Sequence, residues 1–295
     1  MDLSNLTKRI ENNEQEVKAL REKTRIMEML EQYNADDRVV EFYKAIEEIK
    51  EAHKDRPLEQ AMTQIPKLDE ITEGFRPGEL VVLSGPTGNG KTSLMQSLTH
   101  AFTEQAIKCL WFSFEVGPLD FAKKIGQTPA EFYIPKKMKE SNLKWLKERS
   151  LEGMAKFGCR VIFIDHLHYL LSMKELANMS TSLVIGGVMR ELKKFAVSTE
   201  SIIFLSTHLS KTKLENVPDI DDLRDSSFIG QESDFVLMIW RVLAGEKRGS
   251  VKEYVGQQSR ISVRKNRRNG NLGFVDVVYN NSRFAELDKL HDEEH

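Results

Sequence analysis

The sequence predicts an α/β fold built on a mainly parallel sheet, for two reasons. Downstream of Pro66, short apolar runs alternate with amphipathic stretches of helical periodicity, which is typical of strand–helix units. The apolar runs are unbroken and rich in β-branched residues, as expected for strands buried on both faces of a sheet. The expected strands are Leu80–Ser84, Lys108–Phe114, Arg160–Asp165, Ser201–Ser206, Phe235–Trp240, Arg260–Lys265 and Phe274–Tyr279, and the expected helices are Lys91–Glu104, Ser141–Phe157 and Thr181–Val197. A short connection, Asn266–Gly273, joins the last two strands, so we expect a hairpin and an antiparallel edge there.

Upstream of this region, the sequence predicts a separate helical segment. Apolar residues recur at alternating spacings of three and four from Leu3 to Met27, which is a heptad pattern in an otherwise charged stretch. A second helix is expected over about 38–52, and a linker over Arg56–Pro66. We therefore expect an N-terminal helical linker or oligomerisation segment, residues 1–56, and one large domain, residues 57–295. The helical segment either packs on its own domain or docks on a neighbouring subunit or another partner.

The composition excludes several classes of protein. With 295 residues and 40% apolar content, the chain can bury a sizeable core. No run approaches the length of a membrane span and no secretory signal opens the chain, so we expect a cytoplasmic protein with no membrane partner. The two cysteines, Cys109 and Cys159, offer no zinc spacing. The net charge is −2, yet residues 241–283 hold ten Lys and Arg against three Asp and Glu, which suits a nucleotide or an anionic polymer.

One segment carries a complete phosphate-binding motif, G-x-x-x-x-G-K-[ST]. An apolar strand precedes the motif and an amphipathic helix begins at its lysine, which is the context that the motif requires. Glycines let successive backbone N–H groups turn toward phosphate oxygens, and the helix presents its positive end to the same anion. Lys91 is expected to reach the β- and γ-phosphates, and the Thr92 hydroxyl to join the shell of Mg²⁺. The predicted nucleotide-binding residues are Gly85, Pro86, Thr87, Gly88, Asn89, Gly90, Lys91 and Thr92. We therefore expect the chain to bind ATP with Mg²⁺.

Polar side chains follow three further strands at the points where they end. Glu115 is placed to act as a general base on a water in line with the γ-phosphate, although it could be a merely solvated carboxylate. Asp165 ends an apolar run, as a magnesium ligand does in such sites, with capping of the next turn as the alternative. His208 could hydrogen-bond the γ-phosphate, but a single histidine is more often structural.

The chain resembles the ATPase domain of the ring-forming DnaB family of replicative helicases, in particular the branch of the mitochondrial helicase Twinkle and the bacteriophage primase-helicases. The similarity runs from about Ile65 to Phe284, and the order and spacing of short segments carry it. These segments are Phe75–Leu80, Phe112–Glu115, Phe163–His168, Thr207–Lys211, Asp225–Asp234 and Lys265–Arg267. The resemblance implies a RecA-like phosphate-loop ATPase domain over residues 57–295, with the helical segment before it as the linker.

The resemblance also implies roles for individual residues. Glu115 and His208 match the catalytic glutamate and the γ-phosphate sensor of the family. Arg267 and Lys265 match the arginine finger and the basic residue that enter the neighbouring subunit's ATP site, that is, they would act in trans. Arg268 is the alternative candidate for the arginine finger, because one extra residue precedes Asn269 relative to the DnaB pattern. The loops over about 172–180 and 211–227 would line a DNA channel. The residues expected to contact DNA are Arg224, Lys211 and Lys213, and the two lysines could equally be plain surface residues.

The activity that the resemblance implies is ATP-dependent 5′-to-3′ movement along single-stranded DNA by a hexameric homo-oligomer that unwinds forked duplex. The segment before the ATPase domain is too short for a primase, so any primase or polymerase would be a separate partner. Strand exchange by a RecA-type recombination mediator is the alternative from another class. A regulatory ATPase of the circadian-clock type and a helicase loader also stay open.

Overall fold

The computed structural model describes residues 3–32, 39–52, 60–125, 131–171, 176–209, 219, 222, 226–243 and 254–287. The chain divides into two compact units, Met1–Pro57 and Leu58–His295. The described residues of the first unit form two helices, α1 (Leu3–Glu31) and α2 (Phe42–Ala52). Along α1, the heptad residues Leu20 and Met27 are more than half exposed.

The second unit is built on one nine-stranded sheet, with strands in the order β3-β2-β4-β5-β1-β6-β7-β8-β9. Pairing from β3 through β6 is parallel, whereas β6 to β9 form an antiparallel edge. The strands are β1 (Leu80–Ser84), β2 (Cys109–Ser113), β3 (Phe132–Tyr133), β4 (Val161–Asp165), β5 (Ile202–Ser206), β6 (Phe235–Leu243), β7 (Tyr254–Asn266), β8 (Gly273–Asn280) and β9 (Arg283–Glu286). The helices are α3 (Pro66–Thr72), α4 (Lys91–Glu104), α5 (Pro118–Ile125), α6 (Leu143–Phe157), the 3₁₀ helix η1 (Leu167–Leu170), α8 (Thr181–Thr199) and α9 (Ser226–Glu232).

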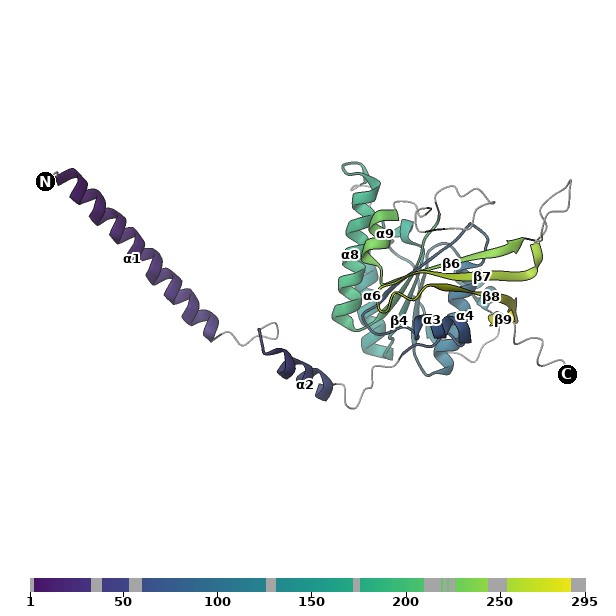
Figure 1. Ribbon diagram of the computed structural model, residues 1–295. Helices are drawn as coiled ribbons and strands as arrows, with labels where there is room; N and C mark the ends of the chain where they lie inside the picture. Colours follow the sequence, from purple (N-terminus) through teal and green to yellow (C-terminus); the bar gives the residue numbers. More distant parts are fainter. Residues whose placement is uncertain are drawn as a thin grey trace. The chain divides into compact units, whose positions relative to one another are not determined.

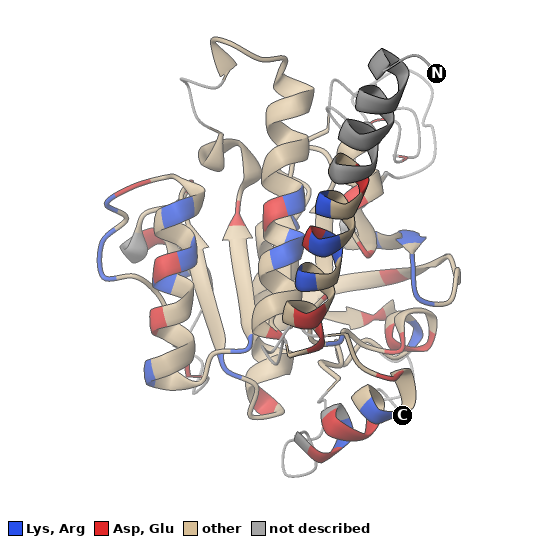
Figure 2. Ribbon diagram, turned by 90° about the vertical axis from the view of Figure 1, so that its left-hand side faces the viewer, with Lys and Arg blue, Asp and Glu red and all other residues tan. Residues whose placement is uncertain are grey.

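Helices cover the sheet on both faces because its central strands are apolar on both sides. In β4, Val161 and Phe163 face one apolar cluster, which α3, α4 and α5 cover, while Ile162 and Ile164 face a second cluster under α6, α8 and α9. Figure 1 shows these two groups of helices. In Figure 2 many of the charged residues lie on helices and loops, and the central strands are almost entirely tan. This is the three-layer arrangement that unbroken apolar strands require.

The parallel register brings the ends of several strands to one edge of the sheet. Ser113 at the end of β2 is paired with Asp165 at the end of β4, and Leu83 of β1 is paired with Ser206 at the end of β5. In an open parallel sheet, this carboxyl edge is where ligands bind. The polar residues that follow β1, β2, β4 and β5 in the sequence therefore gather in one place.

The predicted fold class is confirmed: the sheet is mainly parallel, it has an antiparallel edge, and helices precede it. The expected linker, however, is partly wrong. Ala61 and Ile65 are buried, Ala61 forms a bridge with Phe75, and Pro66 begins α3. The apolar residues of this stretch cover the sheet. In the sequence they stand isolated between prolines and charged residues, so no pattern predicted their burial. Within the described residues, the structure contains no helix that is long and apolar enough to cross a membrane.

Candidate nucleotide-binding site

The backbone of the loop between β1 and α4 packs closely against the strand β6. Gly85 adopts φ of 151°, and a Cβ atom there would lie 2.1 Å from the carbonyl oxygen of Ile239, so only glycine fits. Lys91 is buried, and its ammonium donates hydrogen bonds to the carbonyl oxygens of Gly85 at 2.9 Å and Pro86 at 3.2 Å. Asn89 accepts a 2.9 Å hydrogen bond from the backbone N–H of Arg241 and ties the loop to β6.

A short hydrogen-bonded chain joins this loop to the ends of β4 and β5. The Thr92 hydroxyl donates to the Asp165 carboxylate at 2.8 Å, and Ser206 donates to the other oxygen of the same carboxylate at 2.5 Å. Asp165 is almost fully buried, so these contacts fix its orientation. Adjacent ligands of an octahedral Mg²⁺, with bonds of about 2.0–2.1 Å, stand about 3 Å apart. The oxygens of Thr92 and Asp165 have this spacing and chemistry, so they fit the predicted magnesium role.

Glu115 and His208 lie beside these hydrogen-bonded residues. Glu115 is exposed just beyond β2, where a 2.9 Å hydrogen bond from the backbone N–H of Phe114 to the Asp165 carbonyl extends the β2–β4 pairing. His208 is placed by its neighbour, because the Thr207 N–H donates to the Leu83 carbonyl at 3.0 Å. Glu115, His208 and a third side chain, His166, bring one ligand atom each within 4.8 Å of one another.

The environment changes the protonation behaviour of several of these groups. Burial lowers the pKa of Lys91, and the nearby carboxylates of Asp165 and Glu115 partly restore it. Burial also lowers the pKa of His166 to about 4, helped by repulsion from His208 and His168. The pKa of His208 is lowered by burial first and by the charge of Lys91 second. Both imidazoles are therefore neutral at pH 7.

The predicted trans-acting residues lie at the far end of β7, where they contact their own chain. The ammonium group of Lys265 donates hydrogen bonds to the carbonyl oxygens of Gly230, Gln231 and Ser233, the last at 2.6 Å. These carbonyls belong to the last turn and the end of α9, where a cation is favoured by the helix dipole. Burial lowers the pKa of Lys265 to about 8, with repulsion from Arg267 as the second cause.

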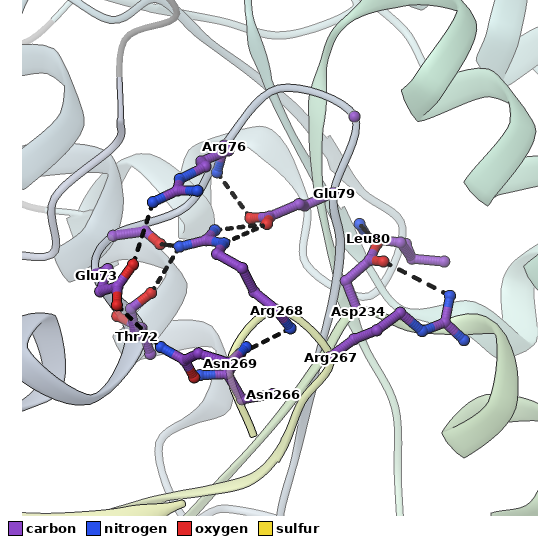
Figure 3. A network of polar contacts seen from close by, with 12 residues as sticks. Thr72, Glu73, Arg76, Glu79, Leu80, Asp234, Asn266, Arg267, Arg268 and Asn269 are labelled. Carbon is purple, nitrogen blue, oxygen red and sulfur yellow. Dashed lines mark hydrogen bonds and ion pairs between the residues drawn. The ribbon is translucent and has the colours of Figure 1, made fainter. Parts of the chain in front are cut away.

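Two consecutive arginines at the hairpin differ sharply in environment (Figure 3). Arg268 is only 15% exposed, pairs with Glu79, and donates to the Thr72 carbonyl at 2.9 Å. Its guanidinium also lies 5.2 Å from the centre of the Phe235 ring. Arg267 keeps 49% of its side chain exposed; it hydrogen-bonds the Gln231 carbonyl and lies 3.7 Å from the Asp234 carboxylate.

The residues expected to contact DNA, Lys211, Lys213 and Arg224, lie outside the residues that the structure describes. The same holds for positions 172–175 of the first expected DNA loop, although the rest of that loop, to Ser180, is described.

Sequence reasoning missed several supporting residues. Ser206 orients Asp165, but a serine at the end of a strand carries no recognisable pattern. Asp234 accepts hydrogen bonds from the Leu80 N–H at 2.8 Å and from the Lys193 ammonium at 2.6 Å, and so links the start of β1 to α8. Leu80, Lys193 and Asp234 lie far apart in the sequence, so no sequence pattern predicted these hydrogen bonds. Glu79, the partner of Arg268, lies in the segment Phe75–Leu80, and nothing in the sequence predicts this ion pair.

The sequence matches a known family model over most of its length. The DnaB-like helicase C-terminal domain matches over residues 61–146 and 127–286. The chain belongs to this family. Replicative DNA helicase DnaB of Leifsonia xyli is 24% identical over 281 residues, 82% of this chain and 60% of that protein. The protein of the same name from Mycoplasma genitalium is 23% identical over 248 residues, 72% of this chain and 53% of that protein. The chain thus spans between half and three fifths of the length of these relatives.

Solved structures agree with the family at the level of the fold. A DnaB-like replicative helicase, described with its interactions with primase, superposes with a TM-score of 0.65 at 17% identity, over 95% of this chain and 76% of that one. A separately solved ATPase domain superposes with a TM-score of 0.69, also at 17% identity, covering 84% of this chain and 99% of that domain. The family that the sequence motifs predict is confirmed. The finer placement beside Twinkle stays a prediction.

Proposed function

We propose that this chain carries the ATPase motor of a replicative DNA helicase, which acts as a six-membered ring, moves 5′ to 3′ along single-stranded DNA and unwinds forked duplex. The observation that carries the proposal is the set of hydrogen bonds joining Thr92, Asp165 and Ser206 beside Lys91. It supports a nucleoside triphosphate site in a chain of the DnaB-like family. The DNA substrate, the direction and the ring come from the family resemblance.

At this site, the chain's own groups divide the work of binding and hydrolysis. The loop Gly85–Thr92 offers backbone N–H groups and the Lys91 ammonium to the phosphates of ATP. Thr92 and Asp165 would hold Mg²⁺, which neutralises charge on the phosphate oxygens. The hydrogen bonds of Lys91 run to carbonyl oxygens of its own loop, so phosphate oxygens can replace these neutral acceptors with charged ones.

Glu115 and His208 complete the hydrolytic half of the site. Glu115 is exposed at the edge where the γ-phosphate would lie, so its carboxylate can accept a proton from an attacking water. His208 is neutral at pH 7 and can donate one hydrogen bond to a phosphate oxygen, which is lost when that phosphate leaves. The segment that follows His208 contains the residues predicted to grip DNA, so this bond is suited to report hydrolysis to the DNA loop.

The remaining charge stabilisation is assigned to a neighbouring copy of the chain. Arg267 is half exposed at the end of the β7–β8 hairpin, which suits a group that reaches into another subunit. Arg268 is engaged with Glu79 and two backbone carbonyls of its own domain, so it does not fit that role. Lys265 would have to leave the end of α9 to act in trans. The helical unit, residues 1–57, would link subunits, and a primase or polymerase would be a separate partner.

Strand separation on a forked duplex tests this proposal. The full chain is incubated with ATP and Mg²⁺ and with forks that lack either the 5′ or the 3′ tail, and Lys91→Ala serves as the control without phosphate contact. Unwinding that requires the 5′ tail and disappears in Lys91→Ala is the expected result. Unwinding that requires the 3′ tail would overturn the direction. Hydrolysis that is indifferent to single-stranded DNA, with no unwinding, would overturn the motor function.

A further inference from the structure

A second set of possible metal ligands lies next to the magnesium oxygens. Glu115, His166 and His208 follow β2, β4 and β5, which are adjacent at the carboxyl edge of the sheet. One ligand atom from each lies within 4.8 Å of the others. Two imidazoles and one carboxylate differ in kind from the oxygens of Thr92 and Asp165. Imidazole nitrogen suits zinc and its neighbours in the first transition row, whereas magnesium takes oxygen.

The two histidine rings already pack against each other. The rings of His166 and His208 meet edge to face with centroids 4.3 Å apart. The Nδ1 atom of His208 is buried and has no hydrogen-bond partner among the residues that the structure describes, which is an unfavourable state for a polar atom. The Nδ1 atom of His166 accepts a hydrogen bond from the backbone N–H of His168, but this bond is long at 3.3 Å. A metal ion bound through Nδ1 of His208 would give this buried nitrogen a partner.

The spacing and charge of the group also suit a transition-metal ion. Zinc bonds of about 2.0–2.2 Å place tetrahedral ligands about 3.4 Å apart. Glu115 is exposed, so rotation of its side chain can close the remaining distance. Its carboxylate supplies an anionic ligand, and each imidazole ring offers a nitrogen ligand. Three protein ligands leave a fourth position open, as in sites of the His₂Glu type.

We propose that Glu115, His166 and His208 bind one first-row transition-metal ion, for which Zn²⁺ is the physiological example, and that the bound ion blocks ATP hydrolysis. Hydrolysis stops because the ion occupies the carboxylate of Glu115 and the imidazole of His208, while Thr92 and Asp165 stay free for magnesium. The metal binding follows from the cluster itself. The inhibition rests, in addition, on the proposed function.

Binding is tested on the nucleotide-free full chain by titration with Co²⁺, followed by its visible absorption. Wild type is compared with His166→Asn and with His168→Asn, a matched control two positions along the chain whose ring lies 6.2 Å from that of His208. We expect one bound ion per chain in wild type and in His168→Asn. Loss of an outer partner of a metal ligand already weakens binding about 10- to 100-fold, so His166→Asn should weaken it at least that much. Glu115→Gln, at an exposed position, provides a second variant whose folding is not at risk.

Equal Co²⁺ affinity in all variants, or no binding in wild type, would overturn the metal site. A cobalt spectrum with thiolate charge transfer would place the ion on Cys109 or Cys159 and would overturn it as well.

Inhibition is tested by ATP hydrolysis with excess Mg²⁺ and increasing Zn²⁺, with each variant compared to its own rate without zinc. Wild type and His168→Asn should lose hydrolysis, whereas His166→Asn should keep its rate at the same zinc concentration. Equal inhibition of His166→Asn would overturn the proposal. If wild type hydrolyses no ATP with Mg²⁺ alone, the proposed function fails, and the cobalt titration still decides the metal site.

Discussion

The phosphate loop and the β7–β8 hairpin both hold side chains that we predict to be functional, but these side chains have different surroundings. At the loop, Lys91 is held by a carbonyl of the loop itself, and Thr92 is hydrogen-bonded to Asp165, which Ser206 also contacts. At the hairpin, Lys265 is used to cap α9 and Arg268 is used to bind Glu79. Arg267, by contrast, combines a cationic group with substantial exposure. We therefore predict that a single subunit can bind nucleotide and that fast hydrolysis needs a second copy.

The largest effect should come from removing the exposed arginine of the hairpin. Arg267→Ala is expected to lower DNA-stimulated ATP turnover by roughly 10³- to 10⁵-fold, the range for arginine fingers. Nucleotide affinity of the isolated subunit should be unchanged, because Arg267 lies away from its own phosphate loop. Phosphate release and binding of a fluorescent ATP analogue measure the two quantities. Mixed rings sharpen the test: Arg267→Ala subunits should regain turnover beside Lys91→Ala subunits if the arginine acts in trans. No recovery in such mixtures would contradict action between subunits.

Lys91→Ala is the corresponding test at the phosphate loop. Loss of one preorganised charge at the phosphates should lower turnover by about 10²- to 10³-fold, and nucleotide binding should weaken too. The fold should persist, because the lysine ammonium is buried against neutral carbonyls and its pKa is already lowered by that burial. Phosphate release, nucleotide binding and thermal unfolding check these outcomes. A collapse of the melting temperature would mean that Lys91 holds the loop structurally.

The neighbouring arginine should affect stability rather than turnover. Arg268→Ala leaves the mostly buried carboxylate of Glu79 without its partner, which should cost about 3 kcal/mol of unfolding free energy. For a unit of this size, that corresponds to a melting temperature lower by roughly 6–12 °C. Differential scanning calorimetry measures it, with Arg267→Ala as the exposed control at the next position. If Arg267→Ala is the less stable of the two, the assignment of the two arginines must be exchanged.

The sequence predicted site residues best where a motif directly follows a strand or lies at its end. The motif Gly85–Thr92 and the apolar run before Asp165 predicted residues that the structure brings into hydrogen-bond contact. Spacing alone did not distinguish Arg267 from Arg268, because the two arginines differ in burial. Phe235 and Glu79, which are distant in the sequence, contact Arg268. The short strands β3 and β9 were also not expected. They contain two and four residues, too few for a periodic signal to show.

The smallest effect concerns Lys265 and separates its structural role from its proposed catalytic one. Burial lowers the pKa of this lysine to about 8 from its ordinary value of 10.5. Between these values the unfolded chain binds more protons than the folded chain, so unfolding free energy should rise with pH through this window. Lys265→Met has no ammonium group at this position and so lacks this pH dependence. The melting temperature of wild type should therefore rise relative to that of Lys265→Met between pH 8 and 10. A difference that is independent of pH would mean that the ammonium is solvated rather than held at the end of α9. In that case Lys265 would be as free as Arg267 to reach a neighbouring subunit, and the hairpin would offer two cations instead of one.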